Sequence, residues 1–590
     1  MSDSIFYARL SEAAGFVQQD LLERAGPMLR ELLADYPDDP YVLQICGILS
    51  MKLNRHAEAE DFFRRAIAAK ADYVEAYNNL GIALRAQRRF SESIEACAMA
   101  LRLRPDDPDI LHNLGGVYRD AGEGPKAVEA IRRALAARDT NEEFWNTLGL
   151  ALLAQSDAAG AVEAFKRAEK ILKFPGFHTN RLFAIHFDPQ ADPESIFAQH
   201  LDWDRQFAQA LRPAILKYPN DRNPSRRLRI GYVSGDFRRH SAAFFIEPLL
   251  VHHDPEKTEI FLYGNSNKWD DITDRIRSYG HHWRDIFGIE DDATYKIVRD
   301  DQIDILVDLS GHTEGARLLV FARKPAPVQV AYLGYPDTTG LSAIDYRLTD
   351  PFLDPPGLID RLYTEKLIRL PHTFACYRPP EDAPPVSDSP ALTNGFVTFA
   401  SFNSLAKVNP QTLDCWAEIL RQVPTSRFLM ATHGLESAET RQRIESIFQS
   451  HGIAPSRLEL LPRHSWPNYL ALHHRADILL DTFPVGGHTV ACHAIWMGVP
   501  VITLTGKTTS QRLAASVLSN LNLQNLIADT PRQFFQTAVD LAADIPRLAD
   551  LRGHLREKFR QSPVVDGAQF AREVESAYRQ MWKEYLSQAQ

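Results

Sequence analysis

Small, basic and hydroxyl-bearing residues gather where short apolar runs of this sequence end. In the segment DTFPVGGHTVACHAIWMGVP, Gly486 and Gly487 precede His488 and Thr489. Two glycines allow the backbone to come close to a ligand, and the residues after them are expected to open a helix that runs through Trp496. The free N–H groups at the start of a helix attract anions. This segment therefore predicts a binding site for a diphosphate.

A second segment, SFNSLAKVNP, places Asn403 and Lys407 where a strand turns into a helix. We expect both side chains at the same anion, with Lys407 supplying a positive charge. The sequence has no GxxxxGK[ST] pattern, which argues against a P-loop kinase or ATPase. No Asp-x-Asp pair follows a strand, so we expect no metal, and we expect Lys407 and helix N–H groups to stabilise a departing diphosphate.

Three further polar clusters, GDFRRH, SGHTEGAR and GYPDTTG, also follow apolar runs. Ligands of open parallel sheets bind at the carboxyl ends of the strands, so these clusters are candidates for the same site. They supply six candidate residues, namely Asp236, His240, His312, Thr313, Thr338 and Thr339.

The elements that must position these groups are strands alternating with helices. Nine short apolar runs read as buried strands: LRIGYVSGDF, EIFLYGNS, DILVDLSGH, VQVAYLGYP, VTFASFN, SRFLMATHG, LELLP, ADILLDTFP and PVITLTG. The proline-rich stretch RPPEDAPPVSDSP is expected to link two Rossmann-like domains, 226–380 and 391–560, with a cleft between them and a last helix in 561–590. Composition alone fits a GT-B glycosyltransferase, a kinase or a synthetase equally well.

The first 171 residues contain an internal repeat of 34 residues, marked by Gly47, Gly81, Gly115 and Gly149. A larger residue follows each glycine by sixteen positions, and small residues recur in phase, as expected for two closely packed antiparallel helices per repeat. The larger residues are Phe63, Cys97, Ile131 and Phe165. The pattern resembles the tetratricopeptide repeat and predicts an α-helical solenoid over 1–171, followed by a helical connector over 172–225.

Within the predicted repeats, Asn79 and Asn113 occupy equivalent places on the first helix of a pair. That helix lines the concave face of such solenoids, where an amide can bind the backbone of an extended peptide. We therefore expect these two residues to bind a protein or peptide partner.

Charge and composition limit the partners and the compartment. The chain has 590 residues, 45% of them hydrophobic, and a net charge of −10, which is the wrong sign for a protein that mainly binds nucleic acid. It has no uninterrupted apolar stretch of membrane-spanning length. Five cysteines without close pairs fit a reducing cytoplasm. We expect a cytoplasmic protein that binds neither nucleic acid nor membrane.

Four longer segments carry a family resemblance: GYVSGDFRRHS, FARKPAPVQVAYLGYPDTTGLSAIDYRLTD, SFNSLAKVNP and GGHTVACHAIWMGVPVITLTG. Behind tetratricopeptide repeats, they resemble the protein O-GlcNAc transferase family, which includes a Spindly-type O-fucosyltransferase branch. The resemblance implies a GT-B fold and an inverting, metal-independent transfer of a sugar to serine or threonine of proteins, without a cofactor. It favours UDP-GlcNAc as donor, with GDP-fucose as the alternative. A scaffold that no longer turns over is a third possibility.

The resemblance also assigns roles to individual residues. His240 matches the active-site histidine, Lys407 the lysine on the donor diphosphate, and His488 with Thr489 the contacts to nucleotide and phosphate. Asp301, in RDDQIDILV, aligns with an aspartate proposed to carry the acceptor's proton away.

The donor pocket departs from the family pattern at its nucleoside end. His493 stands where the family places an acidic residue on the ribose. Trp466 and Tyr469 replace base-binding residues of the animal enzymes and could stack on the base.

Overall fold

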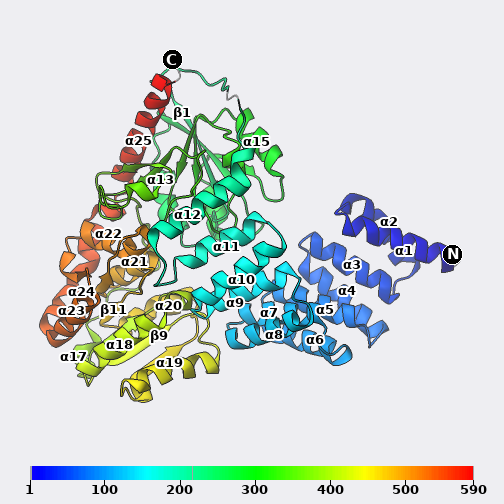
Figure 1. The fold of residues 1–590 in the computed structure, drawn as a ribbon, viewed down its shortest axis with the longest axis horizontal. Helices are drawn as coiled ribbons and strands as arrows, with labels where there is room; N and C mark the ends of the chain where they lie inside the picture. The colour runs from blue at the N-terminus through cyan, green and yellow to red at the C-terminus, as the bar shows by residue number, and fades with distance from the viewer. Residues whose placement is uncertain (1–2, 215–216, 589–590) are drawn as a thin grey trace. The chain divides into compact units, whose positions relative to one another are not determined.

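The computed structural model describes residues 3–214 and 217–588 (Figure 1). It consists of two compact units. The first comprises the described residues up to Gln155 together with 163–173 and 436–440, and the second comprises the remainder. Within the described part of the chain, no helix is long and apolar enough to cross a membrane.

The repeat region is entirely helical, as predicted. Successive helices form antiparallel pairs, beginning with a leading pair that buries Ala13, Ala25 and Leu29. The ten helices are α1 (Asp3–Gln18), α2 (Leu22–Asp35), α3 (Pro40–Lys52), α4 (His56–Ala69), α5 (Val74–Ala86), α6 (Phe90–Leu103), α7 (Pro108–Asp120), α8 (Gly124–Ala137), α9 (Glu142–Ala154) and α10 (Ala158–Ile171).

The repeated glycines are required by close helix packing. A Cβ atom on Gly81 would lie 2.5 Å from the sulfur of Cys97, and one on Gly115 would lie 2.4 Å from Cγ1 of Ile131. The other two glycines meet their own large partners, Phe63 and Phe165, in the same way. The pairing of each glycine with the residue sixteen positions later is therefore confirmed, and it sets the distance between the two helices of each repeat.

The predicted connector consists of two helices, α11 (Pro175–Ile185) and α12 (Pro193–Trp203), followed by one π turn and one 3-10 turn. It is part of the first sheet domain rather than a free linker, because Leu182 and Trp203 are buried in the same cluster as Val233 and Phe261 of the first sheet. A protein that lacked these helices would expose that cluster.

The first sheet has seven parallel strands in the order β3-β2-β1-β4-β5-β6-β7. The strands are β1 (Leu228–Ser234), β2 (Thr258–Gly264), β3 (His282–Asp285), β4 (Ile305–Asp308), β5 (Val328–Ala331), β6 (Tyr346–Thr349) and β7 (Lys366–Arg369). The helices between them are α13 (Ala243–His252), α14 (Asp271–Arg277), α15 (Asp291–Asp300) and α16 (Leu318–Ala322).

The second sheet has six parallel strands in the order β10-β9-β8-β11-β12-β13. The strands are β8 (Thr398–Ser401), β9 (Arg427–Ala431), β10 (Leu458–Leu461), β11 (Ile478–Leu480), β12 (Val501–Leu504) and β13 (Ile527–Ala528). Its helices are α17 (Pro390–Asn394), α18 (Pro410–Gln422), α19 (Ala438–Ser450), α20 (Trp466–Leu472), α21 (Thr489–Trp496), α22 (Leu513–Asn520), α23 (Pro531–Ala543) and α24 (Ile545–Arg560).

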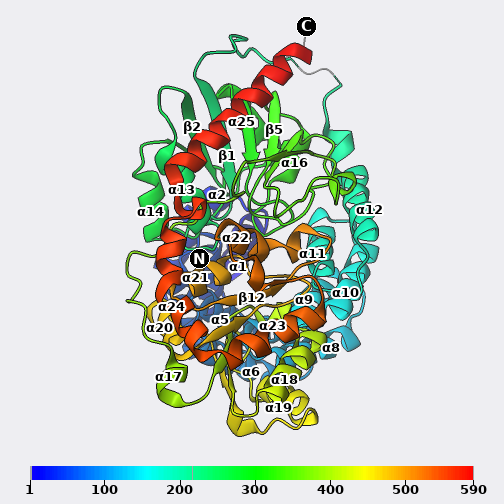
Figure 2. The ribbon, with the colours of Figure 1, turned by 90° about the vertical axis from the view of Figure 1, so that its left-hand side faces the viewer.

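The last helix, α25 (Gly567–Gln588), returns to the first sheet domain. Figure 2 shows it beside α13, the helix that follows β1. Phe570, Tyr578 and Trp582 are buried in one cluster with residues of β1, β4 and β5. The Glu575 carboxylate accepts a hydrogen bond from the His253 ring at 3.0 Å inside this packing. The core of the first sheet domain therefore contains residues from both the beginning and the end of the α/β region.

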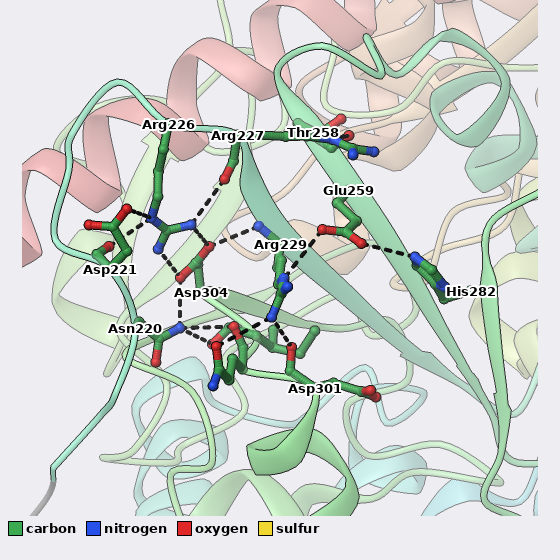
Figure 3. A network of polar contacts seen from close by, with 12 residues as sticks. Asn220, Asp221, Arg226, Arg227, Arg229, Thr258, Glu259, His282, Asp301 and Asp304 are labelled. Carbon is green, nitrogen blue, oxygen red and sulfur yellow. Dashed lines mark hydrogen bonds and ion pairs between the residues drawn. The ribbon is translucent and has the colours of Figure 1, made fainter.

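A buried aspartate, Asp304, connects several segments at the amino-terminal ends of the strands of the first sheet (Figure 3). Asp304 accepts both Nη atoms of Arg226 and the side-chain amide of Asn220. It also accepts the backbone N–H of Arg229 at 2.8 Å. The Arg226 guanidinium in turn lies 5.0 Å from the ring of Trp582 in α25. Asp304 and Arg226 thus connect the segment before β1 to the last helix, α25.

Candidate functional site

The turn between β11 and α21 is shaped by two glycines. A Cβ atom on Gly487 would lie 2.4 Å from Oδ1 of Asn403, so no larger residue fits there without movement of Asn403. His488 is the N-cap residue and Thr489 the first residue of α21. The His488 side chain makes no capping hydrogen bond to this helix. The backbone N–H groups that begin α21 are therefore available to an anion.

The structure brings Lys407 to the same turn. Its ammonium donates a hydrogen bond to the carbonyl oxygen of Gly486 at 2.7 Å. Burial lowers the pKa of Lys407 from its usual value, and the nearby Asp481 carboxylate opposes that shift. Asn403, buried just after the neighbouring strand β8, has an Oδ1 atom without a hydrogen-bond partner among the described residues. The predicted convergence of Asn403, Lys407 and the glycine turn is thus present in the structure.

The His488 ring packs against two aromatic rings of the first sheet domain, those of Phe245 and Phe374. The ring of Phe245 in α13 is parallel to the imidazole, with centroids 4.2 Å apart and an interplanar angle of 14°. Phe374 packs on it at 4.9 Å. Burial lowers the pKa of His488 to about 3, with Lys407 contributing in the same direction. The imidazole is therefore neutral at physiological pH and can act as a hydrogen-bond donor without a charge.

His493 lies in an aromatic cluster one turn further along α21. Its Nδ1 is 3.1 Å from the hydroxyl of Tyr469, while Nε2 is buried without a hydrogen-bond partner among the described residues. The ring makes edge contacts with Phe244 and Trp466, which stack on each other at 5.5 Å. Burial lowers the pKa of His493 to about 3. The predicted trio of His493, Trp466 and Tyr469 is in direct contact.

His240 follows β1 and lies in a cavity of about 270 Å³. The walls of this cavity come from α13 and α14, from the linker at Arg378–Asp382, and from Trp466 of the second sheet domain. The His240 side chain is 41% exposed, and its Nδ1 lies 3.4 Å from the Asp236 carboxylate. Burial lowers the pKa of His240, and Asp236 works against that shift. The histidine thus faces the cleft between the two sheet domains.

Three of the predicted ligand-binding residues are instead part of the protein core. Thr338 and Thr339 are buried, and both hydroxyls donate to the Glu365 carboxylate. His312 is fully buried, and its Nε2 donates to the carbonyl oxygen of Thr339 at 2.8 Å. The expectation that they contact the donor does not fit these positions, because their polar atoms are already satisfied inside the protein. The half-buried Thr313 donates its hydroxyl to Ser310 at 2.7 Å.

Asp301 lies away from His240. It follows α15 and precedes β4, and Arg229, near the start of β1, donates to its carbonyl oxygen at 3.2 Å. Its carboxylate accepts the hydroxyl of Tyr263 at 2.8 Å and pairs with Arg284. Asp301 thus lies at the amino-terminal ends of the strands, whereas His240 lies beyond the carboxyl-terminal end of β1. The expected role of Asp301 in proton transfer does not fit this position.

The two asparagines of the repeats are half-buried on α5 and α7. Asn113 donates its amide to Asn78 of the preceding repeat at 3.0 Å. His112 and Thr147 form the next link of the same kind, with 2.8 Å between Nε2 and Oγ1. The Asn113 amide, predicted to bind a peptide, is therefore partly used in a contact between neighbouring repeats. The two partners of each contact are 35 positions apart in the sequence.

One buried residue at the glycine turn was not predicted from the sequence. Asp481 is buried at the end of β11 and accepts the backbone N–H of Gly487 at 2.8 Å. Its position directly after the apolar run ADILL was the available signal. Across residues 3–214 and 217–588, no group of three or more His, Cys, Asp or Glu side chains is arranged to hold a metal ion.

Two joined parallel-sheet domains, with a lysine at the glycine turn that precedes α21, are features of a GT-B glycosyltransferase, here preceded by tetratricopeptide repeats. The chain belongs to glycosyl transferase family 41, whose family profile matches residues 187–377 and 387–574. The tetratricopeptide repeat profile matches residues 10–74, 47–108 and 112–173.

Named relatives and one solved structure agree with this family. A protein of Solanum lycopersicum, named "Probable UDP-N-acetylglucosamine–peptide N-acetylglucosaminyltransferase SPINDLY", is 41% identical over 414 residues, 69% of this chain and 44% of the relative. The UDP-N-acetylglucosamine–peptide N-acetylglucosaminyltransferase of Caenorhabditis elegans is 26% identical over 478 residues, which cover 61% of this chain and 41% of that protein. This chain thus spans under half the length of these curated relatives.

The structure of a mutant of the O-GlcNAc transferase of Thermobaculum terrenum superimposes with a TM-score of 0.82 at 36% identity. The match covers 88% of this chain and 98% of that one. The predicted fold class, a tetratricopeptide solenoid followed by a GT-B fold, is confirmed.

Proposed function

We propose that this chain transfers N-acetylglucosamine from UDP-N-acetylglucosamine to serine and threonine hydroxyls of proteins, with inversion at the sugar and without a metal ion. The observation that carries the proposal is the convergence of the Lys407 ammonium with the glycine turn that opens α21. The names of the relatives supply the donor and the class of acceptor.

In the proposed reaction the acceptor oxygen attacks the anomeric carbon of the sugar from the face opposite the diphosphate. The bond from that carbon to the diphosphate oxygen breaks, and negative charge builds on the leaving phosphate. Lys407 and the N–H groups at the start of α21 stabilise this charge, which removes the need for a cation from solution. Direct displacement of this kind inverts the anomeric centre.

His240 receives the proton of the acceptor hydroxyl in this proposal. Because its pKa is lowered by burial, the imidazole is neutral near pH 7 and can accept a proton. The Asp236 carboxylate, 3.4 Å from Nδ1, stabilises the imidazolium that forms. Asn403 and Gly487 complete the phosphate site, His488 and Thr489 bind the phosphates, and His493 with Trp466 and Tyr469 holds the nucleoside.

Acceptor proteins are proposed to bind through the repeats, where Asn79 and Asn113 contact the polypeptide backbone. We propose the reducing cytoplasm as the compartment, because the five cysteines are all free thiols.

The test is intact-mass analysis of acceptor proteins incubated with the full chain and one nucleotide sugar at a time. Transfer from UDP-N-acetylglucosamine supports the proposal, and transfer from GDP-fucose alone would contradict the donor. Treatment with EDTA should not change the rate. A rate that EDTA abolishes and added Mg²⁺ or Mn²⁺ restores would contradict the metal-free mechanism.

The contribution of the repeats is tested in the same assay. The double variant Asn79→Ala, Asn113→Ala should raise KM for protein acceptors without changing the affinity for UDP. Asn394→Ala, at an exposed asparagine of the second sheet domain, is the matched control and should change neither.

A further inference from the structure

The buried carboxylate of Asp481 ties together the two segments that form the phosphate site. Its Oδ1 accepts three hydrogen bonds, from Nδ2 of Asn403 at 3.1 Å, from the N–H of Thr482 at 2.9 Å and from the N–H of Gly487 at 2.8 Å. Its Oδ2 accepts the hydroxyl of Thr503 at 2.8 Å. Both oxygens are thus used by neighbours, and the side chain is 1% exposed.

Two of these bonds reach groups that face the ligand site. Gly487 is the residue before His488, so its N–H fixes the backbone immediately ahead of α21. Asn403 lies on the segment after β8 that also carries Lys407. Since Asp481 accepts from both segments, it fixes the spacing between the lysine and the glycine turn.

The charge of Asp481 also acts on Lys407. Burial is the main cause that lowers the pKa of Lys407, and Asp481 is the group that raises it. His488 is also a titratable neighbour of Lys407. Lys407 contributes to lowering the pKa of His488, and the His488 imidazole is neutral. Burial raises the pKa of Asp481, while Lys407 and the hydrogen bonds to its oxygens oppose that rise.

We propose that Asp481 is a positioning residue for the leaving diphosphate, which holds the glycine turn by hydrogen bonds and balances the Lys407 ammonium by its charge. It acts through Gly487, Asn403 and Lys407 and does not itself contact the phosphates. The proposal rests on the proposed function, because it assumes that a nucleoside diphosphate leaves from this site.

The same strand offers a matched control. Asp477 stands at the other end of β11, is also 1% exposed, and accepts three hydrogen bonds where Asp481 accepts four. Its donors are Ser389, Ala391 and Thr398, at the amino end of the sheet. A substitution of Asp477 therefore removes a similarly buried carboxylate but leaves the hydrogen bonds of the phosphate site unchanged.

The experiment separates charge from geometry with two variants of Asp481 in the full chain. In Asp481→Asn the amide oxygen can keep the three bonds to Oδ1, and the new NH₂ group can donate to Thr503, so chiefly the charge is lost. Asp481→Ala removes the bonds as well and leaves buried N–H donors unpaired. The measurements are the dissociation constant of UDP by calorimetry and the dependence of kcat on pH.

For Asp481→Asn we expect UDP affinity at pH 6.5 within about threefold of the parent, because the bonds remain. The alkaline limb of kcat should move to lower pH by about one unit or more, because a nearby opposite charge that favours the Lys407 ammonium is gone. A role in stability alone would not move that limb. Asp481→Ala should weaken UDP binding about tenfold or more.

Asp477→Asn should lower stability without moving the pH profile or the UDP affinity. If the parent binds no nucleoside diphosphate, the proposed function itself is contradicted. If the parent binds UDP but the pH profile of Asp481→Asn coincides with the parent's, the role of the charge is overturned. Parent-like UDP affinity in Asp481→Ala overturns the role of the hydrogen bonds. Should Asp481→Ala fail to fold, the nearly isosteric Asp481→Asn still decides the inference.

Discussion

Removal of the Lys407 ammonium is the most direct perturbation of the proposed mechanism. The ammonium lies 2.7 Å from the Gly486 carbonyl and is therefore held in place before any ligand arrives. At an effective dielectric of about 20, a unit charge about 4 Å from the leaving oxygen is worth about 4 kcal/mol. Loss of one preorganised donor of this kind costs about 2.7–4 kcal/mol in the transition state. Lys407→Ala should accordingly lower kcat by about 10²- to 10³-fold.

The assay is transfer to a protein acceptor under saturating donor, with circular dichroism to show that the variant is folded. Added methylammonium should restore part of the rate of Lys407→Ala, since it can enter the space left by the side chain. Lys507→Ala, at an exposed lysine of the same sheet domain, is the control and should retain full activity. The pH profile provides a second readout, because the lowered pKa of Lys407 means that activity is lost as pH rises through that value. A folded Lys407→Ala with kcat within about threefold of the parent would refute the reasoning.

Three further outcomes are expected. Gly81→Ala should destabilise the repeats by about 1–3 kcal/mol, and the additional change Cys97→Ala should recover most of it, as measured by urea unfolding of the single and double variants. Trp582→Ala should cost about 3–5 kcal/mol, seen as a lower thermal midpoint, whereas a loss below about 1 kcal/mol would show that α25 adds little to the first core. Burial lowers the pKa of His186 to about 3 and of His312 to about 4. Above about pH 6.5 the free energy of unfolding should therefore not depend on the protonation of these histidines. As the pH is lowered from about 6.5 to 4, it should fall by up to about 1.4 kcal/mol per histidine for each pH unit. Replacement of His186 by glutamine should reduce that slope in acid titrations, and an unchanged slope would contradict the assignment.

The sequence predicted the repeats and most of the strands because their signals are local. A glycine and a large residue sixteen positions apart describe one helix contact, which Gly47 and Phe63 show as directly as Gly81 and Cys97. The nine predicted strands all exist, and all but the half-buried edge strand β10 are mainly buried apolar runs. The strands that were missed are short or at an edge: β3 and β7 are partly exposed edge strands, β13 has two residues, and β6 contains the charged Arg347.

The sequence predicted which residues come together where their position depends on backbone shape, and it did not reveal the buried partners that a side chain meets elsewhere in the fold. Two glycines and a lysine after strands were sufficient to predict that Lys407 and the glycine turn lie together. The hydroxyl of Thr338 follows a strand in the same way, yet Glu365, 27 residues later, takes it up. Nothing in the sequence near Thr338 reveals that partner. Asp301 was assigned from the resemblance alone, although its place before the run DILVDL already indicates the amino-terminal end of a strand.

The return of α25 to the first sheet has a consequence for synthesis of the protein. Phe570, which completes the core around β1, follows Ser234 by 336 residues. At roughly 5–20 residues per second, the ribosome needs roughly 20 to 70 seconds to add them. The second sheet uses one continuous stretch from β8 to β13 and can close while the first still exposes the apolar surface that α25 will cover. Of the two sheet domains, the one synthesised first is therefore completed last, and its exposed apolar surface is prone to aggregation during that interval.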